Sequence, residues 1–152
     1  MNEYIMKKYL LIIIVSVLCV IAVAQNNVEA NERSTMKIRI TVGKEVLIAT
    51  MLNTETSRDF ISMLPLTLRL KDYSGTEKVS DLPRRLSTKD APSGYDPSVG
   101  DIAYYSPWGN LAIFYKDFNY SKGLIKLGSF DGGIEKLAGR QGDFEAVLEL
   151  MD

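Results

Sequence analysis

The amino-acid sequence predicts a mainly β domain: a compact, closed, eight-stranded β-barrel with one or two short capping helices. Two observations favour this fold class. Apolar and polar residues alternate with a period of two over several segments, as in strands that bury one face. Helical spacing occurs only in short segments, placed where helices would cover the open ends of a barrel. A sandwich of two sheets, which is the alternative, would not need such helices.

The first predicted element is a β-hairpin. In residues 36–42 every second side chain is apolar and the others are charged or polar. Gly43 and Lys44 form a Gly-X turn of the kind that joins two antiparallel strands. Residues 45–52 are the returning strand.

A short helix is predicted within residues 53–64. Thr56 begins a pattern that resembles a capping box, and apolar residues then recur at helical spacing. Pro65 ends this helix, and residues 66–70 alternate as a third strand. Residues 73–81 are expected to form a shorter and more exposed strand or hairpin.

Residues 82–100 are predicted to form a long ordered loop. The segment holds three of the five prolines of the chain, together with glycines and serines. A linker is the alternative, but nothing after it looks like a second domain with its own core. Loops of this length in compact domains are usually functional.

The rest of the chain is predicted to complete the barrel. Residues 101–105, 111–116 and 124–127 are three further strands, and residues 144–150 alternate as the last one. Residues 134–138 are expected to form one helical turn. The sequence contains no internal repeat.

Residues 1–24 are predicted to be a secretory signal peptide. Two lysines precede an apolar run that ends in a small-residue pattern at Ala24. The run is shorter than the roughly 20 residues that a membrane-spanning helix needs, so cleavage is favoured over a stable membrane anchor. Ala30 is a weaker cleavage site. The protein is therefore expected to be secreted or periplasmic, with a flexible leader at residues 25–35 and the folded domain at residues 36–152.

The composition excludes several classes of function. The chain has 18 Lys plus Arg against 19 Asp plus Glu, so excess basic charge for binding nucleic acid is absent. It has no histidine, which removes imidazole catalysis and the commonest zinc ligand. Cys19, the only cysteine, lies within the signal peptide and follows Leu18 rather than a small residue, which disfavours a lipid anchor. No metal or cofactor is predicted for the domain.

Aromatic residues are concentrated in one part of the domain. Half of the Phe, Tyr and Trp residues of the chain fall between positions 104 and 120. Pro107 and Gly109 favour a turn with Trp108 at its tip. Such rings either fill the barrel, as expected most for Tyr104 and Phe114, or face a ligand. The residues of this segment predicted to bind a ligand are Tyr105, Trp108, Asn110, Phe114 and Tyr120.

Arg84 and Arg85 form an adjacent basic pair at the start of the proline-rich loop. They are either solvated surface residues or part of the site. In the second interpretation one guanidinium reaches the aromatic residues and donates hydrogen bonds to a carbonyl, amide or carboxylate of the ligand. Both arginines are therefore added to the predicted ligand-binding residues.

Three segments resemble a family of small bacterial proteins described as cyclophilin-like. They are residues 36–40 (MKIRI), 100–115 (GDIAYYSPWGNLAIFY) and 123–128 (GLIKLG). The resemblance covers residues 36–150. It implies a compact eight-stranded barrel capped by short helices, in agreement with the strand count above, and a cleft on that barrel.

Two functions are left open, besides a structural interaction domain without a cleft. One is an exported binding module that holds a peptide segment or a small ligand in an aromatic-lined cleft. The other, implied by the resemblance, is a weak peptidyl-prolyl isomerase in which an arginine weakens the resonance of the prolyl amide. The chain lacks the Phe-His pair and the Gln-Thr-Asn-Gly stretch of cyclophilins and has no histidine. These departures favour the binding module.

Overall fold

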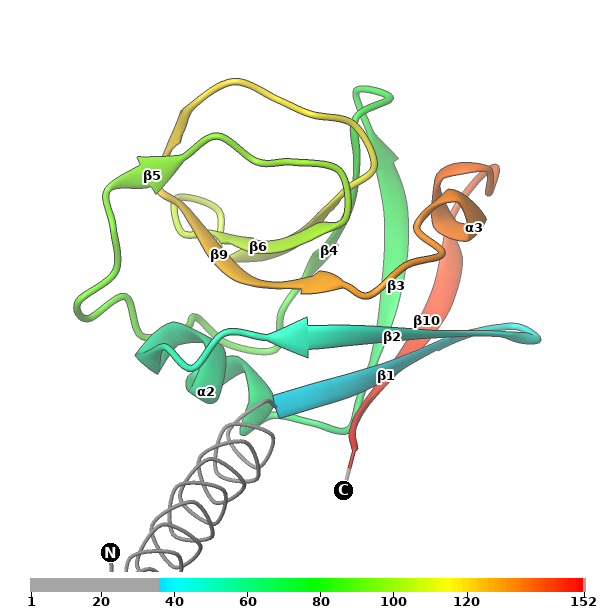
Figure 1. Cartoon of the computed structure of the whole chain (residues 1–152), viewed down its shortest axis with the longest axis horizontal. Helices are drawn as coiled ribbons and strands as arrows, with labels where there is room; N and C mark the ends of the chain where they lie inside the picture. Colours follow the sequence, from blue (N-terminus) through cyan, green and yellow to red (C-terminus); the bar gives the residue numbers. More distant parts are fainter. Residues whose placement is uncertain (1–35, 152) are drawn as a thin grey trace, which may run out of the picture. The chain divides into compact units, whose positions relative to one another are not determined.

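The computed structural model describes residues 36–151, which form ten strands and two helices (Figure 1). The predicted signal peptide, residues 1–24, and the predicted leader, residues 25–35, lie outside the described residues, as does residue 152. No helix within residues 36–151 is both long enough and apolar enough to cross a lipid bilayer.

Eight antiparallel strands close into one barrel in the order β1-β10-β3-β4-β7-β6-β9-β2. The predicted closed, eight-stranded barrel is confirmed, including the opening hairpin and the last strand. The strands are β1 (Met36–Val42), β2 (Glu45–Met51), β3 (Leu66–Tyr73), β4 (Glu77–Asp81), β6 (Asp101–Tyr105), β7 (Asn110–Phe114), β9 (Leu124–Phe130) and β10 (Phe144–Leu150).

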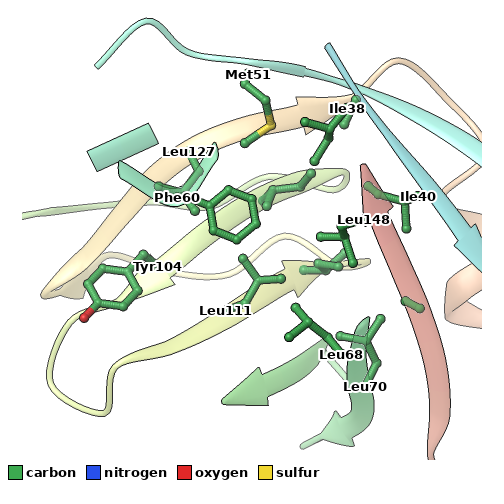
Figure 2. Packing of buried hydrophobic residues seen from close by; sticks show 14 of the residues in the cluster. Ile38, Ile40, Met51, Phe60, Leu68, Leu70, Tyr104, Leu111, Leu127 and Leu148 are labelled. Atoms are coloured by element: carbon green, nitrogen blue, oxygen red, sulfur yellow. The ribbon is translucent and has the colours of Figure 1, made fainter. Parts of the chain in front are cut away.

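Inward-facing apolar side chains of the strands fill the barrel and form the inner core. Because strand side chains alternate between the two faces, the barrel strands other than β4 give alternate residues to this core. Figure 2 shows part of it, with the ring of Phe60 between Leu127, Leu111 and Leu148. Tyr104 also belongs to the inner core, and its hydroxyl accepts a hydrogen bond from the backbone N–H of Leu86 at 3.2 Å.

The two helices lie far apart and cover the two ends of the barrel, as predicted (Figure 1). Helix α2 (Glu55–Ile61) buries Phe60 completely, and α3 (Glu135–Ala138) buries Leu137 completely, both within the inner core. The hydroxyl of Ser57 on α2 donates a hydrogen bond to the carbonyl oxygen of Leu127 at 2.9 Å. The short helices thus replace solvent at the open ends with packed side chains.

The start of α2 differs from the prediction by two residues. The N-cap is Thr54, whose hydroxyl oxygen accepts the backbone N–H of Ser57 at 3.2 Å. Thr56, which the sequence pattern suggested as the cap, is a buried residue of the first turn. Thr54 and Thr56 are two positions apart, and each is followed by a polar residue. The local sequence therefore does not show which of the two threonines is the N-cap.

The short strand or hairpin predicted at residues 73–81 is confirmed, but its predicted exposure is wrong at residues 78–80, which are buried. Strand β3 extends to Tyr73, and β4 is a fully integrated barrel strand with three buried central residues. Lys78 on β4 points into the barrel and is only 2% exposed. Its ammonium group donates hydrogen bonds to Asp72 Oδ1 and to the carbonyl oxygen of Arg140, both at 3.0 Å. These partners compensate the buried charge, so a polar sequence can form a buried strand.

Strands β6 and β7, with parts of β4 and β9, also carry apolar side chains on the outer face of the barrel. This outer cluster consists of Val79, Ala103, Ala112, Phe114 and Leu124, with Tyr95 and Tyr105 packed against it. The predicted loop at residues 82–100 lies beside residues 115–123, and the two segments pair through β5 (Gly94–Tyr95) and β8 (Ser121–Lys122). Sequence periodicity does not detect strands of two residues, and both were missed.

We expect Phe60→Ala to destabilise the domain by about 3–5 kcal/mol, because the truncation removes a completely buried ring and leaves a cavity at the end of the barrel. Chemical denaturation followed by circular dichroism measures this change. Arg58→Ala, on the exposed side of the same helix, is the control and is expected to cost less than about 1 kcal/mol. Equal losses for the two variants would contradict the packing role of Phe60.

Candidate functional site

A pocket of about 390 Å³ lies on the outer face of the barrel, over β7. We call it the β7 pocket. Its volume falls within the range of roughly 300–1,000 Å³ that is usual for small-molecule sites. Its floor consists of Asn110, Ala112, Phe114 and Leu124, and its walls include Tyr73, Glu77, Tyr105, Trp108 and Phe118.

Cross-strand register explains why the surface is hollow there. Ala112 on β7 lies opposite Ala103 on β6 and Val79 on β4, and its small side chain forms the middle of the floor. On either side the outward row is occupied by larger residues, Phe114 at one end and Asn110 with Tyr105 at the other. Small residues between large ones leave a concave surface.

Trp108 stands at the tip of the turn that joins β6 to β7, as the sequence predicts. Gly109 adopts a positive φ of 77°, and its N–H donates to the carbonyl oxygen of Tyr105 at 2.8 Å, which closes the turn. The Trp108 side chain is 59% exposed. Its ring lies edge-on to the ring of Tyr105, with centroids 5.3 Å apart, and edge-on to the ring of Tyr73 at 5.7 Å. The indole is therefore held by two aromatic contacts although it faces solvent.

Gly123 connects this turn to the loop of residues 82–100. Its φ is 84°, and a Cβ atom there would lie 2.8 Å from Cδ of Pro107. The carbonyl oxygen of Gly123 accepts the backbone N–H of Ser106 at 2.9 Å, and its own N–H donates to the carbonyl oxygen of Ser93 at 2.7 Å. Only glycine permits this close approach, which sets the position of the turn that carries Trp108.

Arg85 supports the same turn from the other side. Its Nη1 donates to the carbonyl oxygen of Ser106 at 2.7 Å, and its side chain lies beside Gly109. The guanidinium thus donates to a carbonyl, but to one of the chain's own backbone. Arg85 does not line the β7 pocket.

Arg84 connects the long loop to helix α2. Its Nη2 donates to Asp59 Oδ1 at 2.7 Å and to the hydroxyl of Ser62 at 3.1 Å. The guanidinium of Arg84 and the backbone N–H of Ser87 hold the pKa of Asp59 below its usual value. Like Arg85, Arg84 does not line the β7 pocket.

The structure brings together part of the predicted ligand-binding set. Tyr105, Trp108, Asn110 and Phe114 line the β7 pocket, whereas Arg84, Arg85 and Tyr120 do not. Tyr120 is 54% exposed, and its hydroxyl lies 3.0 Å from the hydroxyl of Ser93.

The lining residues that sequence reasoning missed include Tyr73, Glu77 and Phe118. Tyr73 and Glu77 flank the β3–β4 turn, and strand alternation places their side chains on the outer face. The alternation alone does not show that these residues lie near Trp108, because the order of the strands in the barrel is a property of the tertiary structure.

Among the described residues that line the β7 pocket, Glu77 is the only acidic or basic one. Burial raises its pKa to about 7. Asn110, on the floor, is 5% exposed, and its Oδ1 has no hydrogen-bond partner among the described residues. The lining therefore has one carboxyl, besides the amide of Asn110 and the hydroxyls of its Tyr, Ser and Thr side chains.

A second hollow of about 250 Å³ adjoins the β7 pocket and shares Tyr73, Trp108 and Asn110 with it. It also contains one residue of each charge, Lys71 and Asp81. Within residues 36–151, acidic side chains do not cluster in a set of three or more that suits a metal ion.

We expect the pH dependence of stability to change in Glu77→Gln. The pKa of Glu77 is raised to about 7 in the folded protein, so the proton is bound more tightly there than in the unfolded chain. The contribution of Glu77 to the stability of the folded wild type is therefore fully present below the unfolded pKa near 4.5, and it is lost as the pH rises through the folded pKa of about 7. Glutamine does not ionise, so the melting temperature of Glu77→Gln should rise relative to the wild type between pH 5 and pH 8.

Glu145→Gln, on the exposed face of β10, is the matched control. Its melting temperature is expected to follow that of the wild type over the same pH interval. Parallel curves for wild type and Glu77→Gln would show that the Glu77 carboxyl is solvated rather than buried.

Comparisons with known proteins agree with this fold. A comparison with curated proteins finds no match. Among solved structures, the chain is similar to the hypothetical protein AF2241 from Archaeoglobus fulgidus, with a TM-score of 0.56 and 19% identity over 76% of this chain and 94% of that one. Such low identity supports the fold alone. The model of the cyclophilin-like family matches residues 40–149, and the chain therefore belongs to the cyclophilin-like family.

Proposed function

We propose that this protein is an exported binding module that holds a peptide segment or a small ligand in the β7 pocket. The main support is Trp108, a large ring that is 59% exposed beside a hollow of about 390 Å³. Aromatic rings that reach solvent from a rigid frame are frequent anchors of bound partners.

The frame around Trp108 supports binding because it is already ordered. The turn is held by the guanidinium of Arg85, by the backbone of Gly123 and by the rings of Tyr73 and Tyr105. Few torsions remain to be ordered when a ligand arrives, which lowers the entropic cost of association.

Isomerisation receives less support from the same geometry. The proposed chemistry needs an arginine beside the prolyl nitrogen, but the described lining of the β7 pocket contains no arginine. Arg84 and Arg85 already donate to Asp59 and to the carbonyl of Ser106. Binding without bond rotation is therefore the function that we propose.

Export is the second part of the proposal. It rests on residues 1–24, where two lysines, an apolar run and a small-residue pattern follow the order of a signal peptide. The absence of cysteine after position 24 suits a domain that is stabilised by packing without disulfides.

Ligand binding is expected to change the fluorescence of Trp108, the only tryptophan of the chain. Titrating the protein with proline-containing peptides and with small-molecule mixtures identifies a ligand. Trp108→Ala should then weaken its binding by roughly tenfold or more in calorimetry, since a central aromatic anchor is removed.

Val46→Ala, a truncation of an exposed residue on β2 away from both hollows, should bind with unchanged affinity. A ligand that binds by calorimetry but leaves the emission of Trp108 unchanged would place the binding site elsewhere. A protease-coupled isomerisation assay on the same samples checks the alternative, and catalysed prolyl isomerisation would favour the enzyme over the binding module.

Export predicts a defined mature N-terminus. Protein recovered from the periplasm or medium of a bacterial host should begin at Gln25, or at Asn31 if the weaker site is cleaved. Intact-mass spectrometry distinguishes these products. Recovery of the whole chain, starting at Met1 and bound to membranes, would contradict cleavage.

A further inference from the structure

We propose that the β7 pocket recognises a primary alkylammonium group, carried by a free amine or by a lysine side chain. The inference rests on the proposed function, because it assumes that the pocket binds a ligand, and it adds the chemical class of that ligand. Two features of the pocket support it: its aromatic walls and its single carboxyl.

The aromatic walls are arranged as neighbouring sides of a box. The indole of Trp108 makes interplanar angles of 80° with the ring of Tyr73 and 83° with the ring of Tyr105. The electron-rich faces of aromatic rings attract cations, and an indole does so most strongly. Rings set at near-right angles surround an alkylammonium group better than a flat ligand, which would stack on parallel rings.

The carboxyl of Glu77 lies beside this box. Glu77 is paired with Tyr73 across the β3–β4 ladder and with Phe114 across the β4–β7 ladder. Cross-strand partners have Cβ atoms about 4.5–5.5 Å apart, so the carboxyl is next to the aromatic walls. Among the described residues, the lining supplies no cation to neutralise it, and Lys71 lies in the adjoining hollow.

The nearest basic residue in sequence does not neutralise Glu77 either. Lys78 points to the opposite side of β4, into the barrel, where its ammonium group bonds to Asp72 and to the carbonyl of Arg140. Glu77 is thus an acidic group in an aromatic pocket, and a cation of the ligand would neutralise its charge. An anionic ligand would instead be repelled.

The N–H donors of the cation are also part of the recognition. A primary ammonium has three N–H donors and can form charge-assisted hydrogen bonds with the Glu77 carboxylate, whereas a quaternary ammonium has none. This carboxylate therefore favours a primary amine.

Calorimetric and fluorescence titrations with n-butylammonium and n-butanol test the charge requirement directly, since the two probes have the same carbon chain. We expect n-butylammonium to bind at least about tenfold more tightly than n-butanol at pH 8 and more tightly than tetramethylammonium. Glu77→Gln should remove the preference over n-butanol, and Tyr73→Leu should reduce it.

Glu145→Gln, with the same chemical change on the exposed face of β10, should keep the full preference. Circular dichroism establishes that each variant is folded. Equal affinity for n-butylammonium and n-butanol, or an unchanged preference in Glu77→Gln, would overturn the inference. Absence of n-butylammonium binding to the wild type would overturn it as well.

A short lysine peptide and its Nε-acetylated form identify the source of the amine. Binding of the lysine peptide, lost on acetylation, indicates a peptide ligand; binding of n-butylammonium alone indicates a free amine. Either result supports the inference. If neutral peptides bind and alter the emission of Trp108 while ammonium probes do not, the inference is wrong and the proposed function stands.

Discussion

Burial of both faces of β6 and β7 is the constraint on which the rest of the structure depends. All five residues of β7 are buried, as are four of the five in β6. A barrel interior covers only one face of each strand, so the outward-facing apolar side chains need a second cover. Removing apolar surface from water is the main favourable term in folding, and residues 82–100 and 115–123 supply this cover. The long proline-rich segment is therefore part of the fold rather than a linker.

Backbone hydrogen bonds give the cover a defined position. The N–H of Phe118 donates to the carbonyl oxygen of Pro97 at 3.0 Å, and that of Val99 donates to Asp117 Oδ1 at 2.8 Å. Gly123 then joins the cover to the turn that carries Trp108. The β7 pocket is lined by Ala112, Phe114 and Leu124 of the outer cluster together with Phe118 and Ser121 of the cover. Stability and the candidate site thus arise from one arrangement.

The polar groups of the domain fall into two sets with different roles. Arg84, Arg85 and Lys78 all bond to acceptors within the chain, so their charges serve the fold. Glu77 and Asn110 lie in the β7 pocket without such partners among the described residues. Family membership identifies the barrel, but a fold supports many functions, and the chemistry of this pocket has to come from its own side chains. That chemistry is the basis for the proposed amine specificity.

Much of the fold could be predicted from the sequence because its causes are local. Alternation in residues 36–42 and 144–150 predicts strands, and Pro107 with Gly109 predicts the turn at Trp108. The sequence was less informative at β4, where a buried lysine paired with the exposed Asp72 takes the place of an apolar residue, and at β5 and β8, which are too short for any periodicity. Their formation depends on partners that are distant in the chain.

The sequence by itself determined most of the barrel strands, the helical segments and the aromatic turn, since hydrophobic period and turn chemistry depend on neighbouring residues. The number of those strands favoured the closed barrel. Only the tertiary structure decided which side chains meet at the pocket. Strand order brings Tyr73 and Glu77 to Trp108, and the hydrogen bonds of Arg84 and Arg85 direct both guanidiniums to the chain's own acceptors. The physical reason is that cross-strand register and competition for hydrogen-bond acceptors are settled between segments far apart in the chain.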